Sequence, residues 1–212
     1  MKKTYLFDFD GTLVDSMPTY GGLMIRILDE HGIKYGDDIL KIITPLGFKG
    51  TAKYFVGLGI EKSEEELVAL MYEYAVDEYT HNVPAKKNVP ETLKELKKRG
   101  ASLNVLTASP HASLDPCLKR LGLYELFDNV WSCDDFSTTK ADPEIYKRAA
   151  EKMKVNVEEV IFLDDNFNAD KTAKTAGMIV YGVYDKTSEE YAEEIKAITD
   201  RYITDFIELL DE

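Results

Sequence analysis

Two aspartates separated by one residue are the chemically most suggestive feature of the sequence. Asp8 and Asp10 follow a short apolar run, and Gly11 comes directly after them. Such a run predicts a buried strand of a parallel sheet, which would carry the aspartates at its carboxyl end. Because alternate strand residues point to the same side, both carboxylates can face one site, where their repulsion favours a bound Mg²⁺. One can then act as a nucleophile and the other can transfer protons, although an isolated Asp-x-Asp-Gly is also an ordinary turn.

A second acidic pair ends another apolar run. Asp164 and Asp165 follow residues 160–163, which predict a buried strand. The carboxyl ends of parallel strands meet at one edge of a sheet, so we expect this pair to lie near Asp8. Acids gathered in this way need a metal to stay ionised, so the pair is a candidate partner for the first pair at a metal site. Asp170 is a weaker candidate, since it also fits an acid in the first turn of a helix.

Two further stretches can bind a phosphoryl group. Thr107 follows a predicted strand, so its hydroxyl can donate a hydrogen bond to a phosphoryl oxygen, together with the backbone N–H groups of Ala108 and Ser109. Lys140 precedes a helix predicted over residues 143–153, and its ammonium can pair with the nucleophile and with the phosphate. A turn residue and a solvated surface lysine are the structural alternatives.

These four stretches, in this order, resemble the four motifs of the haloacid dehalogenase-like (HAD) hydrolase superfamily. The first reads Asp-Phe-Asp-Gly-Thr-Leu-Val-Asp-Ser from Asp8, and the fourth is the Asp164-Asp165 doublet. In the third motif, Ala141 after Lys140 replaces the commoner proline. The resemblance covers essentially the whole chain and is to the subgroup with a small helical cap, which includes phosphoglycolate phosphatase and beta-phosphoglucomutase. It implies an α/β fold with a doubly wound parallel sheet of strand order 5-4-1-2-3 and an inserted all-helical cap.

The resemblance also implies a mechanism. Asp8 would attack phosphorus, and Asp10 would protonate the leaving alcohol and then activate water. Mg²⁺ would bind Asp8, Asp165 and the main-chain carbonyl of Asp10. Asp165 is the expected main metal ligand because its distance to Gly177 matches the helix that follows this motif in the family, and Asp164 would be an outer or alternate ligand.

The order of predicted elements indicates two parts. Helices and strands alternate from about Pro90 to the C-terminus, which predicts a parallel sheet with right-handed crossovers. The segment after the first strand instead carries only helical patterns. We expect this insertion to act as a lid that excludes water from the sheet edge. The expected division is an α/β core of residues 1–15 and 85–212 and a helical cap of residues 16–84.

Substrate choice would belong to the cap. Residues 44–51 are rich in helix breakers and predict an exposed loop, followed by a short helix from about Ala52. Lys49 in this loop is the candidate for binding the leaving group, with Lys53 and Tyr20 less favoured. A solvated loop lysine is an equally weighted alternative for Lys49.

Composition narrows the partners and the compartment. The net charge of -13, from 39 acidic against 26 basic residues, disfavours nucleic acids and anionic membranes as partners. No apolar run approaches the length of about 18 residues that a membrane span needs. Cys117 and Cys133 lack the spacing of a metal site, so we expect reduced thiols in a cytoplasmic protein. We expect a monomer or weak homodimer.

The favoured function is a Mg²⁺-dependent phosphatase that hydrolyses a small phosphorylated metabolite through a phosphoaspartyl intermediate. A beta-phosphoglucomutase-like sugar phosphomutase is the alternative, because it uses the same residues and differs in how the cap excludes water. A dehalogenase would need neither Asp10 nor the acidic doublet. A non-catalytic phosphoacceptor is disfavoured because Asp10 would promote hydrolysis of the acyl phosphate. An inactive binding protein is also disfavoured, because none of the expected catalytic residues is missing from the sequence.

Overall fold

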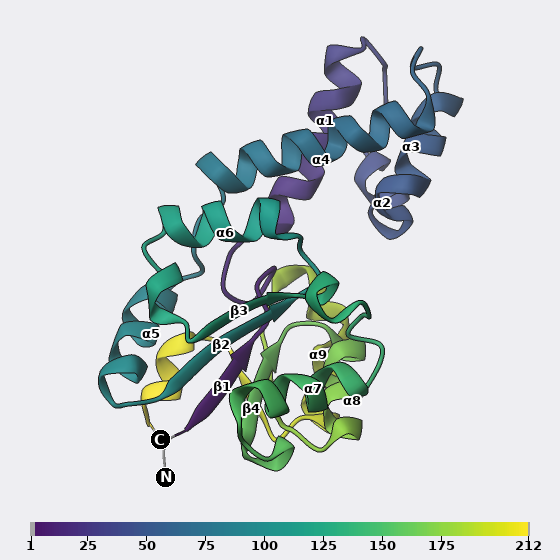
Figure 1. Cartoon of the computed structure of the whole chain (residues 1–212). Helices are drawn as coiled ribbons and strands as arrows, with labels where there is room; N and C mark the ends of the chain where they lie inside the picture. The colour runs from purple at the N-terminus through teal and green to yellow at the C-terminus, as the bar shows by residue number, and fades with distance from the viewer. Residues whose placement is uncertain (1–2, 212) are drawn as a thin grey trace. The chain divides into compact units, whose positions relative to one another are not determined.

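The computed structural model describes residues 3–211. The chain divides into two compact units, which are drawn in Figure 1. The first consists of Met1–Asp15 and Pro84–Glu212, and the second of Ser16–Val83. The chain therefore leaves the first unit after its first strand and the following turn, and returns to it at Pro84.

A six-stranded parallel sheet forms the centre of the first unit, in the order β3-β2-β1-β4-β5-β6. Its strands are β1 (Thr4–Phe7), β2 (Ser102–Thr107), β3 (Asn129–Ser132), β4 (Val160–Asp164), β5 (Ile179–Val183) and β6 (Arg201–Ile203). The first five strands have the expected 5-4-1-2-3 order, so the predicted fold class is confirmed. The sixth strand was not predicted, because it is short and has no apolar run, and it pairs only with β5 at the edge of the sheet.

Helices connect the strands, as the alternating pattern predicts. They are α5 (Val89–Lys98), α6 (His111–Arg120), α7 (Glu144–Met153), α8 (Phe167–Ala176) and α9 (Ala192–Ile198), with short 3₁₀ turns η2 (Tyr124–Leu126), η3 (Cys133–Phe136), η4 (Val157–Glu159), η5 (Lys186–Tyr191) and η6 (Phe206–Asp211). The polar helix predicted over residues 188–197 is divided between η5 and α9.

Both faces of the sheet are covered, which explains why its strands are apolar throughout. Leu6 of β1 and Phe162 of β4 belong to a buried cluster with residues of α7 and α8, which lie together on one side of the sheet in Figure 1. Phe7, the next residue along β1, points to the other face and stacks on Phe206 of η6. The two-residue period of the strand thus distributes its side chains between two hydrophobic layers.

The second unit, whose backbone is described throughout, contains only helices. They are α1 (Met17–Glu30), α2 (Ile39–Ile43), the 3₁₀ turn η1 (Thr44–Leu46), α3 (Gly47–Gly57) and α4 (Glu64–His81). The buried core of this unit consists of apolar residues that recur every three or four positions along each helix. Met24 of α1, Phe55 of α3 and Met71 of α4 are examples. The capping box predicted at Ser63 is present, since Ser63 and Glu66 bond to each other's backbone N–H groups.

The prediction of an exposed loop over residues 44–51 is wrong. These residues form η1 and the first turns of α3 instead. Pro45 lies in the first turn of η1, where its fixed backbone angle is tolerated, and Gly47 adopts a left-handed φ of 61° at the junction with α3. Burial of Thr51 and Phe55 on one face of α3 favours a helix over a solvated loop.

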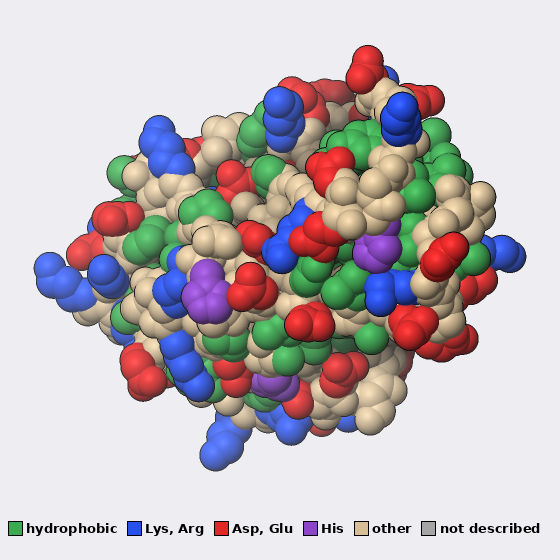
Figure 2. All heavy atoms as spheres, turned by 90° about the horizontal axis from the view of Figure 1, so that it is seen from above, with side chains coloured by type: hydrophobic (Ala, Val, Ile, Leu, Met, Phe, Trp, Pro, Cys, Tyr) green, Lys and Arg blue, Asp and Glu red, His purple; other side chains and the backbone are tan. Residues whose placement is uncertain are grey.

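The surface of the protein carries many charged side chains of both signs. Acidic and basic side chains are interspersed across the face seen in Figure 2. Among residues 3–211, no helix has both the length and the apolar character needed to cross a bilayer.

Candidate active site

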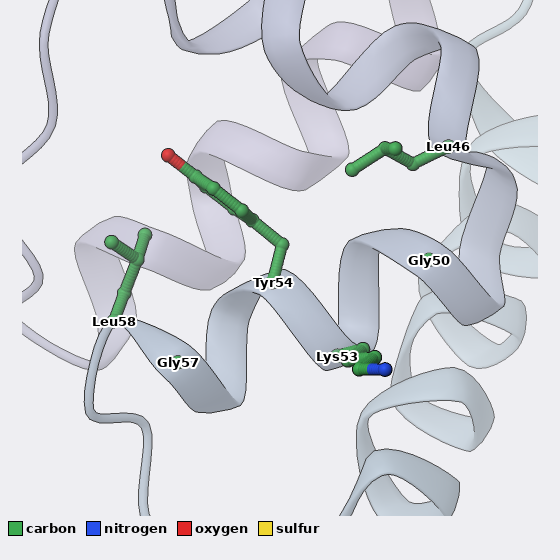
Figure 3. Close-up of a pocket in the computed structure, with 6 residues that line it drawn as sticks. All are labelled: Leu46, Gly50, Lys53, Tyr54, Gly57 and Leu58. Carbon is green, nitrogen blue, oxygen red and sulfur yellow. The ribbon is translucent and has the colours of Figure 1, made fainter.

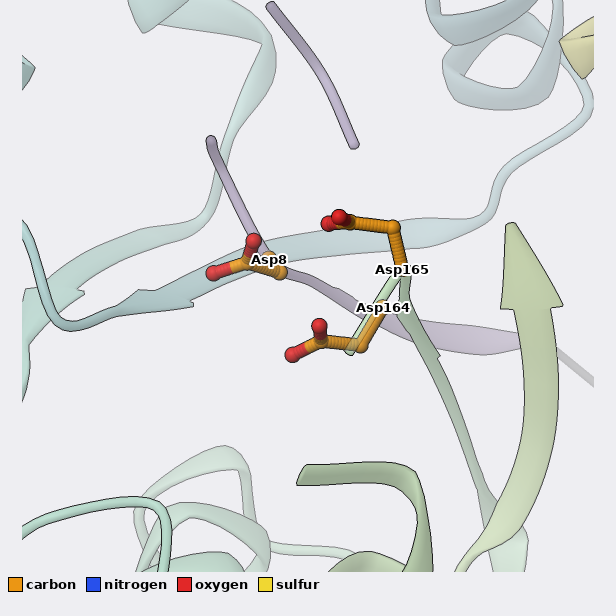
Figure 4. Close-up of side chains that lie close together, drawn as sticks. All are labelled: Asp8, Asp164 and Asp165. Carbon is orange, nitrogen blue, oxygen red and sulfur yellow. The ribbon is translucent and has the colours of Figure 1, made fainter. Parts of the chain in front are cut away.

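Three aspartates form an acidic cluster at the carboxyl ends of two neighbouring strands. One carboxylate oxygen from each of Asp8, Asp164 and Asp165 lies within 4.8 Å of the other two. Figure 4 shows these three side chains close together. Parallel pairing of β1 with β4 sets Phe7 opposite Leu163, and the Asp8 N–H continues this ladder by donating to the Leu163 carbonyl at 2.8 Å. Strand register therefore brings together acids that are more than 150 positions apart in the chain.

Lys140 places a positive charge inside this cluster. Its ammonium donates hydrogen bonds to Oδ1 of Asp8 and, at 2.8 Å, to Oδ2 of Asp164. Its side chain is 14% exposed, and burial by itself would lower its pKa. Asp164 and Asp8 outweigh this effect and raise the pKa of Lys140 well above its usual range, so the ammonium stays charged.

One lysine does not neutralise the buried carboxylates. Burial, reinforced by Asp164 and Asp165, raises the pKa of Asp8 well above its usual range despite the opposing effect of Lys140. Burial and Asp164 also raise the pKa of Asp165, to about 7. A divalent cation would remove this excess negative charge, and a donor set made only of carboxylate oxygens suits a hard cation such as Mg²⁺.

Asp10 lies outside the acidic cluster and contacts the loop after β2. Its Oδ2 accepts a hydrogen bond from the hydroxyl of Ser109. The backbone N–H of Ser109 in turn donates to Oγ1 of Thr107 at 3.0 Å, while the neighbouring Ala108 is exposed. The hydroxyl of Thr107 keeps its own proton for another acceptor, whereas the Ser109 N–H, expected to face a phosphate, is engaged within the loop.

The turn that follows β1, at Gly11 and Thr12, lies directly against Asp165 of the acidic cluster. Gly11 has a φ of +72°, and a Cβ atom there would lie 2.6 Å from Oδ2 of Asp165. Thr12 donates a hydrogen bond of 3.1 Å to Oδ1 of the same carboxylate. The carbonyl of Gly11 accepts a hydrogen bond from Lys86. The sequence did not predict the hydrogen bond from Thr12 to Asp165 or the one from Lys86 to Gly11. The position of Thr12 inside the first motif was the one signal that could have indicated its role.

Asp170, the alternative metal candidate, does not belong to the three-aspartate cluster. It lies in the first turn of α8, as predicted, but it is fully buried. Neither of its carboxylate oxygens has a hydrogen-bond partner among the described residues. Burial, followed by Asp164 and Asp165, raises its pKa well above the usual range, so a neutral carboxyl is favoured at this position.

The lysines considered for substrate binding lie in the second unit, on α3. Lys49 is exposed and lines a pocket of about 580 Å³ whose other lining residues include Glu64 and Tyr72. Lys53 lines a different pocket of about 450 Å³. Figure 3 shows the residues that line it. The hydroxyl of Tyr20 is within hydrogen-bond distance of the Thr51 hydroxyl, at 3.4 Å.

Residues 2–177 match the family model described as hydrolase, haloacid dehalogenase-like hydrolase. The chain belongs to the haloacid dehalogenase-like hydrolase family. This HAD-like hydrolase is an enzyme, and its curated relatives include proteins named as a phosphatase and a pyrophosphatase. The acidic cluster of Asp8, Asp164 and Asp165, which could bind a metal, lies within the matched residues.

Two curated relatives illustrate the likeness in sequence. The HAD-like hydrolase is 31% identical over 186 residues to validoxylamine A 7'-phosphate phosphatase of Streptomyces hygroscopicus subsp. limoneus, covering 86% of each chain. It is 30% identical over 180 residues to the pyrophosphatase PpaX of Bacillus velezensis, covering 84% of this chain and 81% of the relative.

Solved structures share the fold of the HAD-like hydrolase. A Thermotoga maritima protein assigned as a beta-phosphoglucomutase superposes with a TM-score of 0.86 at 24% identity, covering 99% of this chain and 98% of that one. The assigned HAD hydrolase YfnB of Bacillus subtilis, crystallised bound to magnesium, superposes with a TM-score of 0.83 at 15% identity, covering 99% and 97%. Both likenesses concern the arrangement of the backbone.

Proposed function

We propose that this HAD-like hydrolase is a Mg²⁺-dependent phosphatase that hydrolyses a small phosphorylated metabolite through a phosphoaspartyl intermediate on Asp8. The observation that carries the proposal is the acidic cluster of Asp8, Asp164 and Asp165 with the ammonium of Lys140 bound to Asp8. The names of the relatives, a phosphatase and a pyrophosphatase, support the same class of reaction.

In the first step, a carboxylate oxygen of Asp8 forms a bond to phosphorus while the bond from phosphorus to the leaving oxygen breaks. Asp10 gives its proton to that leaving oxygen, so the product departs as an alcohol. The hydrogen bond from Ser109 fixes the carboxyl of Asp10 for this transfer. Thr107 and Lys140 are the groups that would hold the phosphoryl oxygens, with the N–H of Ala108 as a further donor.

In the second step, Asp10 takes a proton from a water molecule. The oxygen of that water forms a bond to phosphorus while the bond to Asp8 breaks, which releases inorganic phosphate and restores the Asp8 carboxylate. An acid beside the nucleophile therefore serves both halves of the reaction.

Asp8, Asp165 and the main-chain carbonyl of Asp10 would hold the Mg²⁺, with Asp164 as a further oxygen donor. When bound, Mg²⁺ would neutralise negative charge on the phosphate and make phosphorus a better electrophile. The raised pKa values of Asp8 and Asp165 support this assignment, because burial and then repulsion from neighbouring aspartates disfavour their ionised forms, and a bound cation would offset both effects.

We further propose that the helical segment of residues 16–84 acts as a cap and selects the substrate. Lys49, exposed on α3, is the candidate for binding the leaving group. The buried thiols of Cys117 and Cys133, which form no disulfide, and the acidic composition support a cytoplasmic enzyme with neither nucleic acid nor membrane as a partner. A monomer or weak homodimer remains our expectation.

A panel of phosphorylated metabolites, assayed for phosphate release with and without Mg²⁺, tests the function. The panel includes pyrophosphate and sugar phosphates, and glucose 1-phosphate is also checked for isomerised product. Phosphate release is the expected result, isomerisation without release would favour the mutase, and no turnover would favour a binding protein.

The variant Asp8→Asn tests the nucleophile. It should abolish phosphate release from a generic aryl phosphate while the fold stays intact, because an amide cannot form the acyl phosphate. Asp37→Asn, the same change at an exposed position of the other unit, is the control and should keep full activity. Undiminished turnover in Asp8→Asn would refute the nucleophile assignment.

A further inference from the structure

The ammonium of Lys86 joins three segments at the carboxyl edge of the sheet. It donates hydrogen bonds to the carbonyl of Gly11 at 2.5 Å and to the carbonyl of Tyr184 at 2.6 Å. It also forms an ion pair of 3.1 Å with Oδ2 of Asp185, whose side chain is only 6% exposed. All three N–H donors of one lysine are thus used, and its side chain is 18% exposed.

The backbone around Lys86 is also hydrogen-bonded to the turn that follows β1. Its N–H donates to the carbonyl of Leu13 at 3.0 Å, and the preceding residue, Ala85, forms an antiparallel bridge with Val14. The N–H of Asp15 donates to the carbonyl of Pro84. The segment that returns to the first unit therefore pairs with the turn that follows β1.

That turn bears directly on the candidate metal site. Gly11 allows no room for a Cβ atom beside Asp165, and Thr12 donates a hydrogen bond to the same carboxylate. The carbonyl of Gly11, in the same turn, accepts a hydrogen bond from Lys86. A chain of contacts thus runs from Lys86 through Gly11 and Thr12 to Asp165.

We propose that Lys86 is a positioning residue that holds the Gly11–Thr12 turn against Asp165, so that this carboxylate keeps the orientation in which it binds a divalent cation. The inference rests on the proposed Mg²⁺ site. Lys86 does not touch substrate in this proposal. Groups that hydrogen-bond directly to a metal-binding carboxylate, as Thr12 does, are worth about 10- to 100-fold in metal affinity, and Lys86, which acts through the turn, should contribute at the lower end of this range.

The test measures the Mg²⁺ dissociation constant of the whole protein by calorimetry, without substrate. Lys86→Met removes the ammonium while keeping most of the apolar stem, and it should weaken Mg²⁺ binding by about tenfold. Lys86→Arg should recover part of the affinity because it restores a cationic donor. Lys87→Met is the matched control, since its side chain is 84% exposed and lies 3.7 Å from Asp205, and its Mg²⁺ affinity should equal that of the wild type.

A double-mutant cycle distinguishes positioning from general stabilisation. Thr12→Val removes the hydrogen bond to Asp165 without changing the charge and should also weaken Mg²⁺ binding. If Lys86 acts through the turn, the double variant loses less affinity than the product of the two single losses. Independent losses would overturn the proposal. An unchanged Mg²⁺ affinity in Thr12→Val would also overturn it, and this result can be obtained even if Lys86→Met does not fold.

The remaining outcomes are also decisive. Lower stability of Lys86→Met with an unchanged Mg²⁺ affinity would assign Lys86 a purely structural role and refute the proposal. That result would leave the proposed function intact, because the wild type would still bind Mg²⁺ and release phosphate. A wild-type protein that binds no Mg²⁺ would instead overturn the metal site and the role of Lys86 together.

Discussion

Lys140 donates a hydrogen bond of 2.8 Å to Oδ2 of Asp164 at the carboxyl end of β4. The same ammonium also binds Asp8, so one lysine offsets two buried carboxylates that belong to different strands. Because these groups are largely removed from water, their interactions are screened much less than those of surface charges.

Lys140→Met should lower kcat/KM by roughly 10²- to 10³-fold, the usual effect of removing a group that stabilises charge in the transition state. Without metal, the free energy of unfolding should also fall by about 3 kcal/mol, because two buried carboxylates lose their counter-charge. Lys147→Met is the control, since Lys147 pairs only at the surface with Glu144. Steady-state kinetics and urea unfolding measure both effects, and unchanged kinetics would exclude Lys140 from the site.

Gly11→Ala should destabilise the protein more than Gly122→Ala. Both glycines have a left-handed φ, +72° and +67°, so each substitution costs about 1 kcal/mol in backbone strain. At Gly122 a Cβ atom meets nothing within 4 Å, whereas at Gly11 it would lie 2.6 Å from Oδ2 of Asp165. Gly11→Ala should therefore also weaken Mg²⁺ binding. Equal free energies of unfolding in the two variants would contradict the close approach of the turn to Asp165.

Mg²⁺ binding should strengthen as pH rises from 6 to 8. In the metal-free enzyme, burial and Asp164 raise the pKa of Asp165 to about 7, so a proton competes with the cation below that pH. Calorimetry in buffers with different ionisation enthalpies should detect proton release on binding, more at pH 6 than at pH 8. Binding that is independent of pH, with no proton release, would contradict the raised pKa.

The stability of the metal-free enzyme should show the opposite pH dependence. Unfolded aspartate has a pKa near ~3.9, and the folded state holds the Asp165 proton more tightly. The contribution of Asp165 to stability is therefore fully present below about pH 4 and is lost as pH rises through about 7. Asp165→Asn should reduce this decline in urea unfolding experiments, and an equal decline in both proteins would assign it to other groups.

His111 should titrate above the ordinary histidine pKa of about 6.5. Its Nδ1 lies 2.8 Å from Oδ1 of Asp115 and its Nε2 lies 2.9 Å from Oδ2 of Asp135, and these hydrogen bonds raise the pKa of the imidazole. The stabilisation is present below about pH 6.5 and is lost as pH rises through the folded-state pKa. Asp115→Asn and Asp135→Asn should each lower the value measured by imidazole NMR, while the signals of His31 and His81 serve as internal references. A value that neither substitution moves would refute these pairings.

Local patterns were sufficient to predict most elements of the fold. The alternation of apolar strands with amphipathic helices after Pro90 predicted the parallel sheet, and Ser63 with Glu66 marked the start of α4. The pattern failed at residues 44–51, where Pro45 and Gly47 begin helical segments instead of a loop. Breakers at the start of a helix look in sequence like breakers in a loop, and only the burial of one face of α3 separates the two cases.

The sequence by itself determined the chemistry available to this enzyme. Paired carboxylates at the ends of apolar strands must meet at one sheet edge, because parallel strands share their direction. Only the tertiary structure decided how those groups are oriented. The contact from Lys86 to Gly11 joins residues 75 positions apart, and that from Thr12 to Asp165 joins residues 153 positions apart. No local period encodes such pairs, because they depend on how separate segments pack against each other once the sheet has formed.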